Sequence, residues 1–218
     1  MTTTGDDALV VSLAEALGPA CSPADARRTA ADLLRRWREP HRRYHTADHL
    51  RATLDAVREL PAPADLDTGA VDLAVWFHDA VYAGRPGDDE EASAVLAERL
   101  LPGLHQPPHR VAEVARLVRL TARHDPTPDD VAGQLLCDAD LAILAAPDSR
   151  YRAYADAVRE EYAHVPDAVF RAARAQVLRG LLERPGALYR TDAARRLWQA
   201  RALGNVRAEL RSLTAPAG

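Results

Sequence analysis

Apolar residues recur three and four positions apart along almost the whole of this chain, and alternating runs of β-branched residues are rare. That spacing gathers apolar side chains on one face of an α-helix, whereas a half-buried strand needs alternation. The pattern therefore predicts an all-α fold. A chain of 218 residues can bury a sizeable core, so we expect a single domain over residues 1–218.

Prolines and capping residues mark the ends of the expected helices. Ser22 before Pro23 is a strong helix start, and Pro40 stops that helix. The same signals predict about eight to ten helices, with a turn at Pro185-Gly186. The clearest helices cover about residues 23–39, 46–60, 68–82, 89–101, 108–123, 130–140, 149–163, 166–182 and 191–213.

Composition and charge exclude several classes of protein. Hydrophobic residues make up 47% of the chain and charged residues 28%, as in ordinary globular proteins, so neither a disordered chain nor a membrane protein fits. The formal net charge is -4 and the basic residues are spread along the chain, which disfavours duplex nucleic acid as a partner. Asp6 and Asp7 are wrong for the start of a secretory signal, so we expect a cytoplasmic protein.

Two residue types narrow the chemistry further. All 28 basic residues are arginine, so there is no lysine for a Walker-type phosphate loop or a Schiff base. Any phosphate must be held by arginine, backbone amides or a metal. Cys21 and Cys137 lie far apart and form no CxxC pair, and we interpret them as small buried hydrophobes.

Polar residues interrupt the most apolar helices. His78 and Asp79 stand near the end of the helix expected at 68–82, which is apolar nearly all round there and should be the central one. Burying one unpaired polar group costs about 2–7 kcal/mol, and a metal ion bound by the pair would remove that cost. Asp138 and Asp140 interrupt a later apolar helix. Because positions two apart point to different sides, we expect only one of them to reach a site.

A further histidine pair lies earlier in the chain. His45 and His49 are four positions apart at the start of the helix expected at 46–60, so their side chains share a face. Two imidazoles at that spacing are common in metal and catalytic sites. A zinc protease places a glutamate directly after the first histidine, and Thr46 stands there instead, so that class is excluded.

A series of short motifs follows along the chain. They are Arg43-Tyr44-His45, Trp76-Phe77-His78-Asp79-Ala80-Val81-Tyr82, Glu90 with Ser93-Ala94, Asp138-Ala139-Asp140-Leu141 and Arg159-Glu160-Glu161-Tyr162. In this order they resemble the HD superfamily of metal-dependent phosphohydrolases, and more narrowly its branch of predicted, largely uncharacterised members. The resemblance spans about Arg43 to Asn205. It implies an HD-like helical core over about residues 43–145, followed by a helical extension over about 148–213.

The resemblance also implies a site that holds one or two divalent ions. His45, one turn away from the metal, is then the general acid, as in the cyclic-nucleotide phosphodiesterases that share the Tyr-His-x-x-x-His pattern. Asp79 is implied to bridge metals or to orient water. The implied ligands are His49, His78, Asp79 and Asp140, with Asp140 chosen over Asp138 by its Ala-Asp-Leu context.

Two more residues have implied roles beside these ligands. His124 matches a position where many HD proteins hold a further histidine, which implies contact with a second metal or with phosphate. Glu90 is either a base or ligand near the metal or, as a first-turn acid, a partner of the helix dipole. Arg43 and Arg123 are candidates to clamp phosphate oxygens.

The chemistry of this ligand set agrees with a catalytic site. Two neutral imidazoles and two carboxylates leave a divalent ion about neutral with open positions, which favours catalysis over structural support. Mixed nitrogen and oxygen ligands suit Mn, Fe, Co, Ni or Zn better than Mg. Water bound to such an ion has its pKa lowered towards about 7 and can attack phosphorus.

The sequence therefore predicts a metal-dependent phosphohydrolase, a phosphomonoesterase or phosphodiesterase, that acts on a small phosphate ester or a nucleotide. Two alternatives stay open. One is an HD-fold ligand-binding or regulatory module with little catalytic activity, and the other is a helical interaction protein with a structural metal. Glu161 is explained almost as well by helix packing and surface salt bridges as by a family role. The pattern leaves the oligomeric state open.

Overall fold

The computed structural model describes residues 4–184 and 187–215. Over these residues the protein has ten α-helices and two short 3-10 helices and contains no β-strand, so the all-α expectation is confirmed. The turn expected at Pro185-Gly186 lies outside the described residues. The helices are α1 (Thr4–Leu17), α2 (Pro23–Trp37), α3 (Ala47–Glu59), α4 (Thr68–Phe77), α5 (Asp88–Leu100), η1 (Leu101–Leu104), α6 (Pro108–Leu120), α7 (Val131–Asp140), η2 (Leu141–Ala145), α8 (Asp148–Glu161), α9 (Asp167–Leu182) and α10 (Asp192–Thr214).

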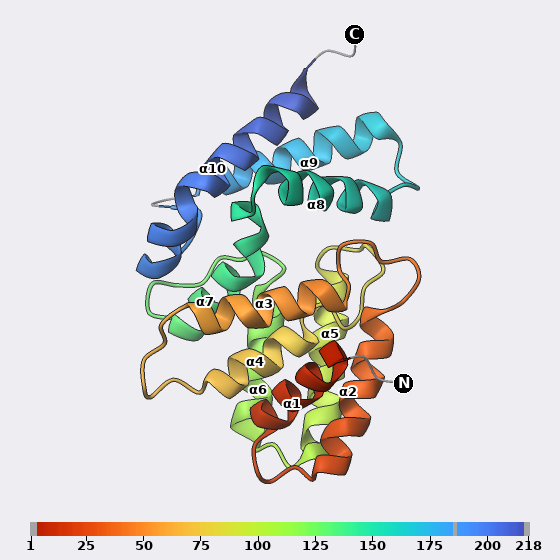
Figure 1. Ribbon diagram of the computed structural model, residues 1–218, viewed down its shortest axis with the longest axis vertical. Helices are drawn as coiled ribbons and strands as arrows, with labels where there is room; N and C mark the ends of the chain where they lie inside the picture. Colours follow the sequence, from red (N-terminus) through yellow and green to blue (C-terminus); the bar gives the residue numbers. More distant parts are fainter. Residues whose placement is uncertain (1–3, 185–186, 216–218) are drawn as a thin grey trace.

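The helices form two adjoining groups. Figure 1 shows α1 to α6 packed together in one half of the molecule and α8 to α10 in the other, with α3 and α7 running along the junction. Helix α10 packs on α9 and on η2, which continues directly from α7. None of the described helices is both long and apolar enough to cross a membrane.

Helix α4 lies at the centre of the larger group, as its all-round apolar sequence predicted. It contacts α1, α3, α5, α6 and α7, and its residues from Leu73 to Phe77 are fully buried. The indole nitrogen of Trp37 on α2 donates a hydrogen bond to the carbonyl of Trp76 at 3.1 Å. The polar residues at the end of this helix are therefore surrounded by the core.

Two boundaries differ from the expectation. Helix α4 ends at Phe77 rather than near Tyr82, so His78 and Asp79 stand at a helix end and not within a helix. The reason is the buried guanidinium of Arg42, which donates hydrogen bonds to the carbonyls of Asp79 at 2.7 Å and Ala80 at 3.4 Å. Carbonyls engaged in this way do not accept the backbone hydrogen bonds of a continuing helix. The N-terminal helix α1, which the boundary signals did not predict, is held by its buried leucines against α2 and α4.

The C-terminal helices are fastened to α7 by buried polar contacts. Asp138 on α7 accepts hydrogen bonds from the backbone N–H groups of Arg190 and Thr191, both at 2.7 Å, and from the Thr191 hydroxyl at 2.8 Å. Asn205 on α10 donates to the carbonyls of Leu144 and Ala146 at 2.8 and 2.9 Å. These contacts set the start of α10 directly behind the helix that carries Asp140.

One carboxylate on α4 is largely buried and lacks a hydrogen bond on one of its oxygens. An oxygen of Asp72 is buried without a hydrogen-bond partner. Burial raises the pKa of Asp72 from 3.8 to about 6, and the charge of Arg58 opposes the rise only in part. The folded state therefore holds this proton more tightly than the unfolded chain, so the associated stability is present below pH 3.8 and is lost as the pH rises through about 6.

We predict that Asp72→Asn, which cannot ionise, raises the free energy of unfolding by about 1 kcal/mol at pH 8, a value discounted for the partial exposure of the side chain. Near pH 4 the substitution should have little effect. Urea denaturation at the two pH values measures the difference, and Asp156→Asn, at an exposed position of α8, serves as control. Equal effects of Asp72→Asn at both pH values would contradict the prediction.

Candidate metal centre

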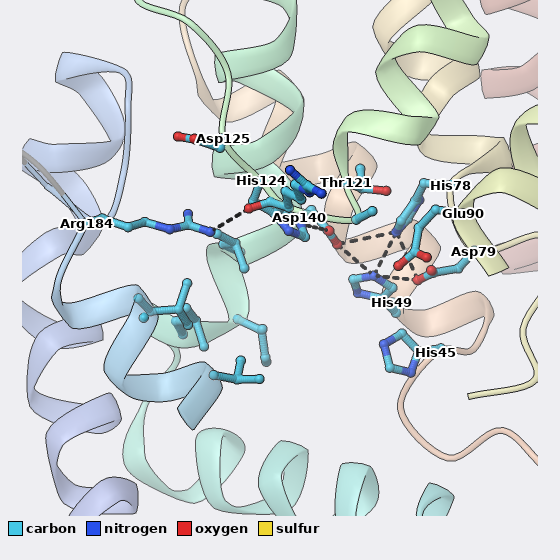
Figure 2. A pocket seen from close by; sticks show the side chains of 18 of the residues that line it. His45, His49, His78, Asp79, Glu90, Thr121, His124, Asp125, Asp140 and Arg184 are labelled. Atoms are coloured by element: carbon cyan, nitrogen blue, oxygen red, sulfur yellow. Dashed lines mark hydrogen bonds and ion pairs between the residues drawn. The ribbon is translucent and has the colours of Figure 1, made fainter. Parts of the chain in front are cut away.

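Two imidazoles and two carboxylates meet near the junction of the two groups of helices. His49 comes from α3, His78 caps the end of α4 and is followed by Asp79, and Asp140 is the last residue of α7. The Nε2 atoms of His49 and His78 are 3.2 Å apart. Figure 2 shows the carboxylates of Asp79 and Asp140 on either side of the two rings. The structure thus brings together the four residues that the sequence predicted as metal ligands.

The spacing of these donor atoms suits a single ion. Oδ1 of Asp140 lies 3.0 Å from Nε2 of His49 and 3.3 Å from Nε2 of His78. Oδ2 of Asp79 lies 3.1 Å from Nε2 of His78 and 3.7 Å from Nε2 of His49. Ligands about 2.1 Å from a common ion are about 3.0 Å apart in octahedral and about 3.4 Å apart in tetrahedral geometry. His49, His78 and Asp79 alone offer three donors within 4.8 Å of one another.

Contacts behind the rings hold the imidazoles in place. Nδ1 of His78 lies 2.9 Å from the carbonyl of Val75, which can only accept, so Nδ1 carries a proton and Nε2 faces the cluster. Nδ1 of His49 faces the hydroxyl of Thr53 at 3.5 Å. Trp37 packs against both rings, with centroid distances of 6.2 Å to His49 and 5.5 Å to His78. The apolar wall and the backbone hydrogen bond together fix the orientation that metal ligation needs.

The two ionised carboxylates and the neutral form of His49 favour the binding of a cation. Burial opposes ionisation of Asp79 and Asp140, yet the nearby charge of His78 outweighs it and lowers the pKa of both carboxyl groups. Burial also opposes the charged form of His78, but the two carboxylates prevail and raise its pKa well above the usual value. For His49, burial prevails and lowers the pKa, which favours the neutral imidazole that binds metals.

The structure separates the two aspartates of α7. Asp140 faces the cluster, whereas Asp138 is buried on the other side and caps the start of α10 through Arg190 and Thr191. The expectation that one of the two reaches the site therefore agrees with the geometry. Asp138 belongs to the attachment of the C-terminal helices.

His124 supports Asp140 rather than joining the cluster directly. Its Nε2 lies 2.6 Å from Oδ2 of Asp140, the oxygen that faces away from the two histidines. Its backbone has φ of 50°, in the left-handed region that non-glycine residues rarely adopt. Such backbone strain is tolerated where the surroundings hold the residue in place. In this arrangement His124 orients the carboxylate, and contact with a second metal or with phosphate remains a prediction.

His45 lies directly before α3, whose N-cap is Thr46. Its ring is 5.8 Å from that of His49, and it stacks on Tyr82 at 4.4 Å. Nδ1 of His45 is 2.7 Å from Oε2 of Glu161. Burial lowers the pKa of His45, but Asp79 and Glu161 outweigh it and raise that pKa.

Glu161 is a functional candidate that sequence analysis undervalued. One oxygen accepts the backbone N–H groups of Arg43, Tyr44 and His45 at 2.7, 2.9 and 3.0 Å. The other accepts from His45 and from the Tyr82 hydroxyl, the latter at 2.8 Å. The side chain is 1% exposed, which no surface salt bridge would show. The Arg-Glu-Glu-Tyr motif was the available signal, but it did not tell which glutamate turns inward.

Two of the remaining candidates, Glu90 and Arg123, line an open cavity of about 640 Å³. Glu90 lines it and also accepts the Gly87 N–H at 2.6 Å, and Gly87 has a φ of 90° that favours glycine. Of the two candidate phosphate clamps, Arg123 lines the cavity, whereas Arg43 pairs with Glu160 at 3.3 Å. The cavity continues from the cluster to the ends of α9 and α10.

Comparison with protein-family models, curated proteins and solved structures finds no match for this chain. The interpretation of the site therefore rests on its residues and their geometry.

We predict that Asp140→Asn weakens Mn²⁺ binding at least about tenfold, because the variant loses a charged donor between the two imidazoles. Asp138→Asn should bind Mn²⁺ as the wild type does but lose about 1–3 kcal/mol of stability, because the amide replaces an acceptor of buried N–H groups. Calorimetric titration and urea denaturation of both variants check this. Loss of metal binding in Asp138→Asn alone would reverse the assignment.

We also predict that Glu161→Gln destabilises the protein by about 3 kcal/mol at pH 7. Both carboxylate oxygens of Glu161 accept hydrogen bonds, whereas the amide of glutamine has only one accepting oxygen. Glu160→Gln, at an exposed neighbour, should stay within about 0.5 kcal/mol of the wild type. His45 and the backbone N–H groups lower the pKa of Glu161 to about 2, so this stability is present above pH 4.5 and is lost as the pH falls towards 2. Urea denaturation from pH 7 to 3 should show the gap between wild type and variant closing.

Proposed function

We propose that this protein is a metal-dependent phosphohydrolase that cleaves a small phosphate ester or a nucleotide. One observation carries the proposal: two imidazole Nε2 atoms and two ionised carboxylates lie 3.0 to 3.7 Å apart, nitrogen to oxygen, at the wall of an open cavity. This set leaves coordination positions free for water and substrate, as catalytic metal sites do. Its mixed donors suit Mn, Fe, Co, Ni or Zn better than Mg.

The placement of the ligands along the chain supports an HD-type core. The histidine comes from α3, the His-Asp pair from the end of α4 and the last aspartate from the end of α7. We propose that α3 to η2 correspond to the HD-like core and that α8 to α10 form the helical extension. The resemblance in motifs and this convergence in space support the same assignment independently.

The chain's own residues have separable tasks in the proposed reaction. A divalent ion bound here supplies a nucleophilic water at neutral pH and positive charge beside the phosphoryl oxygens. Asp79 and Asp140 place their charges on opposite sides of the imidazole pair, and His124 keeps Asp140 from rotating. These contacts preorganise the site before substrate enters.

His45 is suited to protonate the leaving oxygen. Its Nδ1 is engaged by Glu161 and its ring is stacked on Tyr82, which leaves Nε2 as the atom available to substrate. The ring lines the same cavity as the cluster. General acid catalysis from such a position contributes about 10²- to 10⁴-fold.

The test measures metal content and hydrolysis of a panel of phosphomonoesters, cyclic nucleotides and nucleotides. We predict that Asp79→Asn lowers kcat/KM at least about 100-fold, whereas Asp48→Asn, at a position 92% exposed beside His49, leaves it unchanged. Equal hydrolysis by wild type and Asp79→Asn contradicts the proposal. Ligand binding without turnover would instead favour the regulatory module, and unfolding by chelator the structural metal.

A further inference from the structure

The wall of the cavity away from the cluster carries a guanidinium that pairs with no carboxylate among residues 4–184 and 187–215. Arg184 follows the end of α9 and lines the same cavity as His49 and Asp79. Within the part of the chain that the structure describes, its hydrogen bond goes to the carbonyl of Arg123, at 3.0 Å. Figure 2 shows the side chain reaching across the cavity towards His124 and Asp140.

Two neighbouring arginines on this wall, Arg174 and Arg190, are engaged by acids. Arg174 binds Glu209 at 2.8 Å, and both side chains are almost buried. Arg190 binds Asp125 at 2.8 Å. Burial and the charge of Arg190 lower the pKa of Arg184, and the charges of Asp125 and Asp138 oppose this shift in part. Glu183, a further acid of the lining, is exposed.

Contacts within the fold hold this guanidinium on the cavity wall opposite the cluster (Figure 2). Asp138, which lies on α7 two residues before Asp140, accepts hydrogen bonds from the backbone N–H groups of Arg190 and Thr191. The bond from Arg184 to the Arg123 carbonyl joins the end of α9 to the residue that precedes His124. These contacts therefore connect the segments that carry Asp140 and His124 to the segment that carries Arg184 and Arg190.

We propose that Arg184 binds a second anionic group of the substrate while the scissile phosphate lies at the metal centre. The substrate class is then a phosphate ester that carries a further phosphate, such as a nucleoside or sugar bisphosphate. The identity of the scissile group rests on the proposed function. The anion site at Arg184 does not depend on that function.

Geometry favours a second group over the scissile one. In Figure 2, His124 and Asp140 stand between the guanidinium and the pair His78 and Asp79, so a single phosphate at the metal centre leaves Arg184 without an anion. A volume of about 640 Å³ lies within the range of about 300–1,000 Å³ that small-molecule sites occupy. A planar guanidinium also binds phosphate through two parallel hydrogen bonds.

The binding test uses the full-length chain treated with chelator and titrated with inorganic pyrophosphate. Wild type and Arg179→Gln, at an exposed position of α9, should bind alike, and Arg184→Gln should bind at least about tenfold more weakly. Arg184→Lys keeps the charge and should bind at an intermediate level. Asp79→Asn should retain binding, because it alters only the metal centre. No binding by wild type, or equal binding by Arg184→Gln, overturns the inference.

A kinetic test with Mn²⁺ then separates this inference from the proposed function. Arg184→Gln should raise KM for a nucleoside 3′,5′-bisphosphate about tenfold with kcat little changed, and should leave KM for the 5′-monophosphate unaltered. Equal effects on both substrates overturn the second-group assignment. If no variant hydrolyses either substrate while pyrophosphate binding still depends on Arg184, the hydrolase fails and the anion site stands.

Discussion

Charge buried in an apolar core is the constraint on which this structure depends. Asp79 and Asp140 are held ionised beside fully buried helix α4, where an unpaired charge could not persist. Two imidazoles and a third histidine behind Asp140 compensate these charges. The chain ends two helices at these residues, α4 and α7, so that their side chains can converge from different directions.

The C-terminal helices are part of the same site. Helix α8 contributes Glu161, which organises the loop that carries His45, and the segment after α9 contributes Arg184. In return, Asp138 of the core caps the start of α10. The proposed division into an HD-like core and a helical extension therefore does not divide the candidate site, because residues from both parts line one cavity.

Much of the fold and of the candidate site could be predicted from residue pattern. Periodicity, prolines and caps placed most helices. Polar residues in apolar helices pointed to His78, Asp79, Asp138 and Asp140, and the resemblance in motifs implied the ligand set His49, His78, Asp79 and Asp140. Three features escaped. The end of α4 depends on Arg42, which is distant in sequence, and the inward turn of Glu161 depends on where α8 docks. Arg184 is one of 28 arginines, and its place on the cavity wall beside the acid-paired Arg174 and Arg190 is visible only in space.

The amino-acid sequence by itself determined the all-helical class, the central position of α4 and the kind of donor atoms available to a cation, because these follow from local periodicity and side-chain chemistry. Only the tertiary structure decided that Asp138 caps the start of α10, that His124 holds Asp140, and that α8 and α9 complete the cavity. Those outcomes depend on how helices pack against one another, and packing direction is a property of the assembled core.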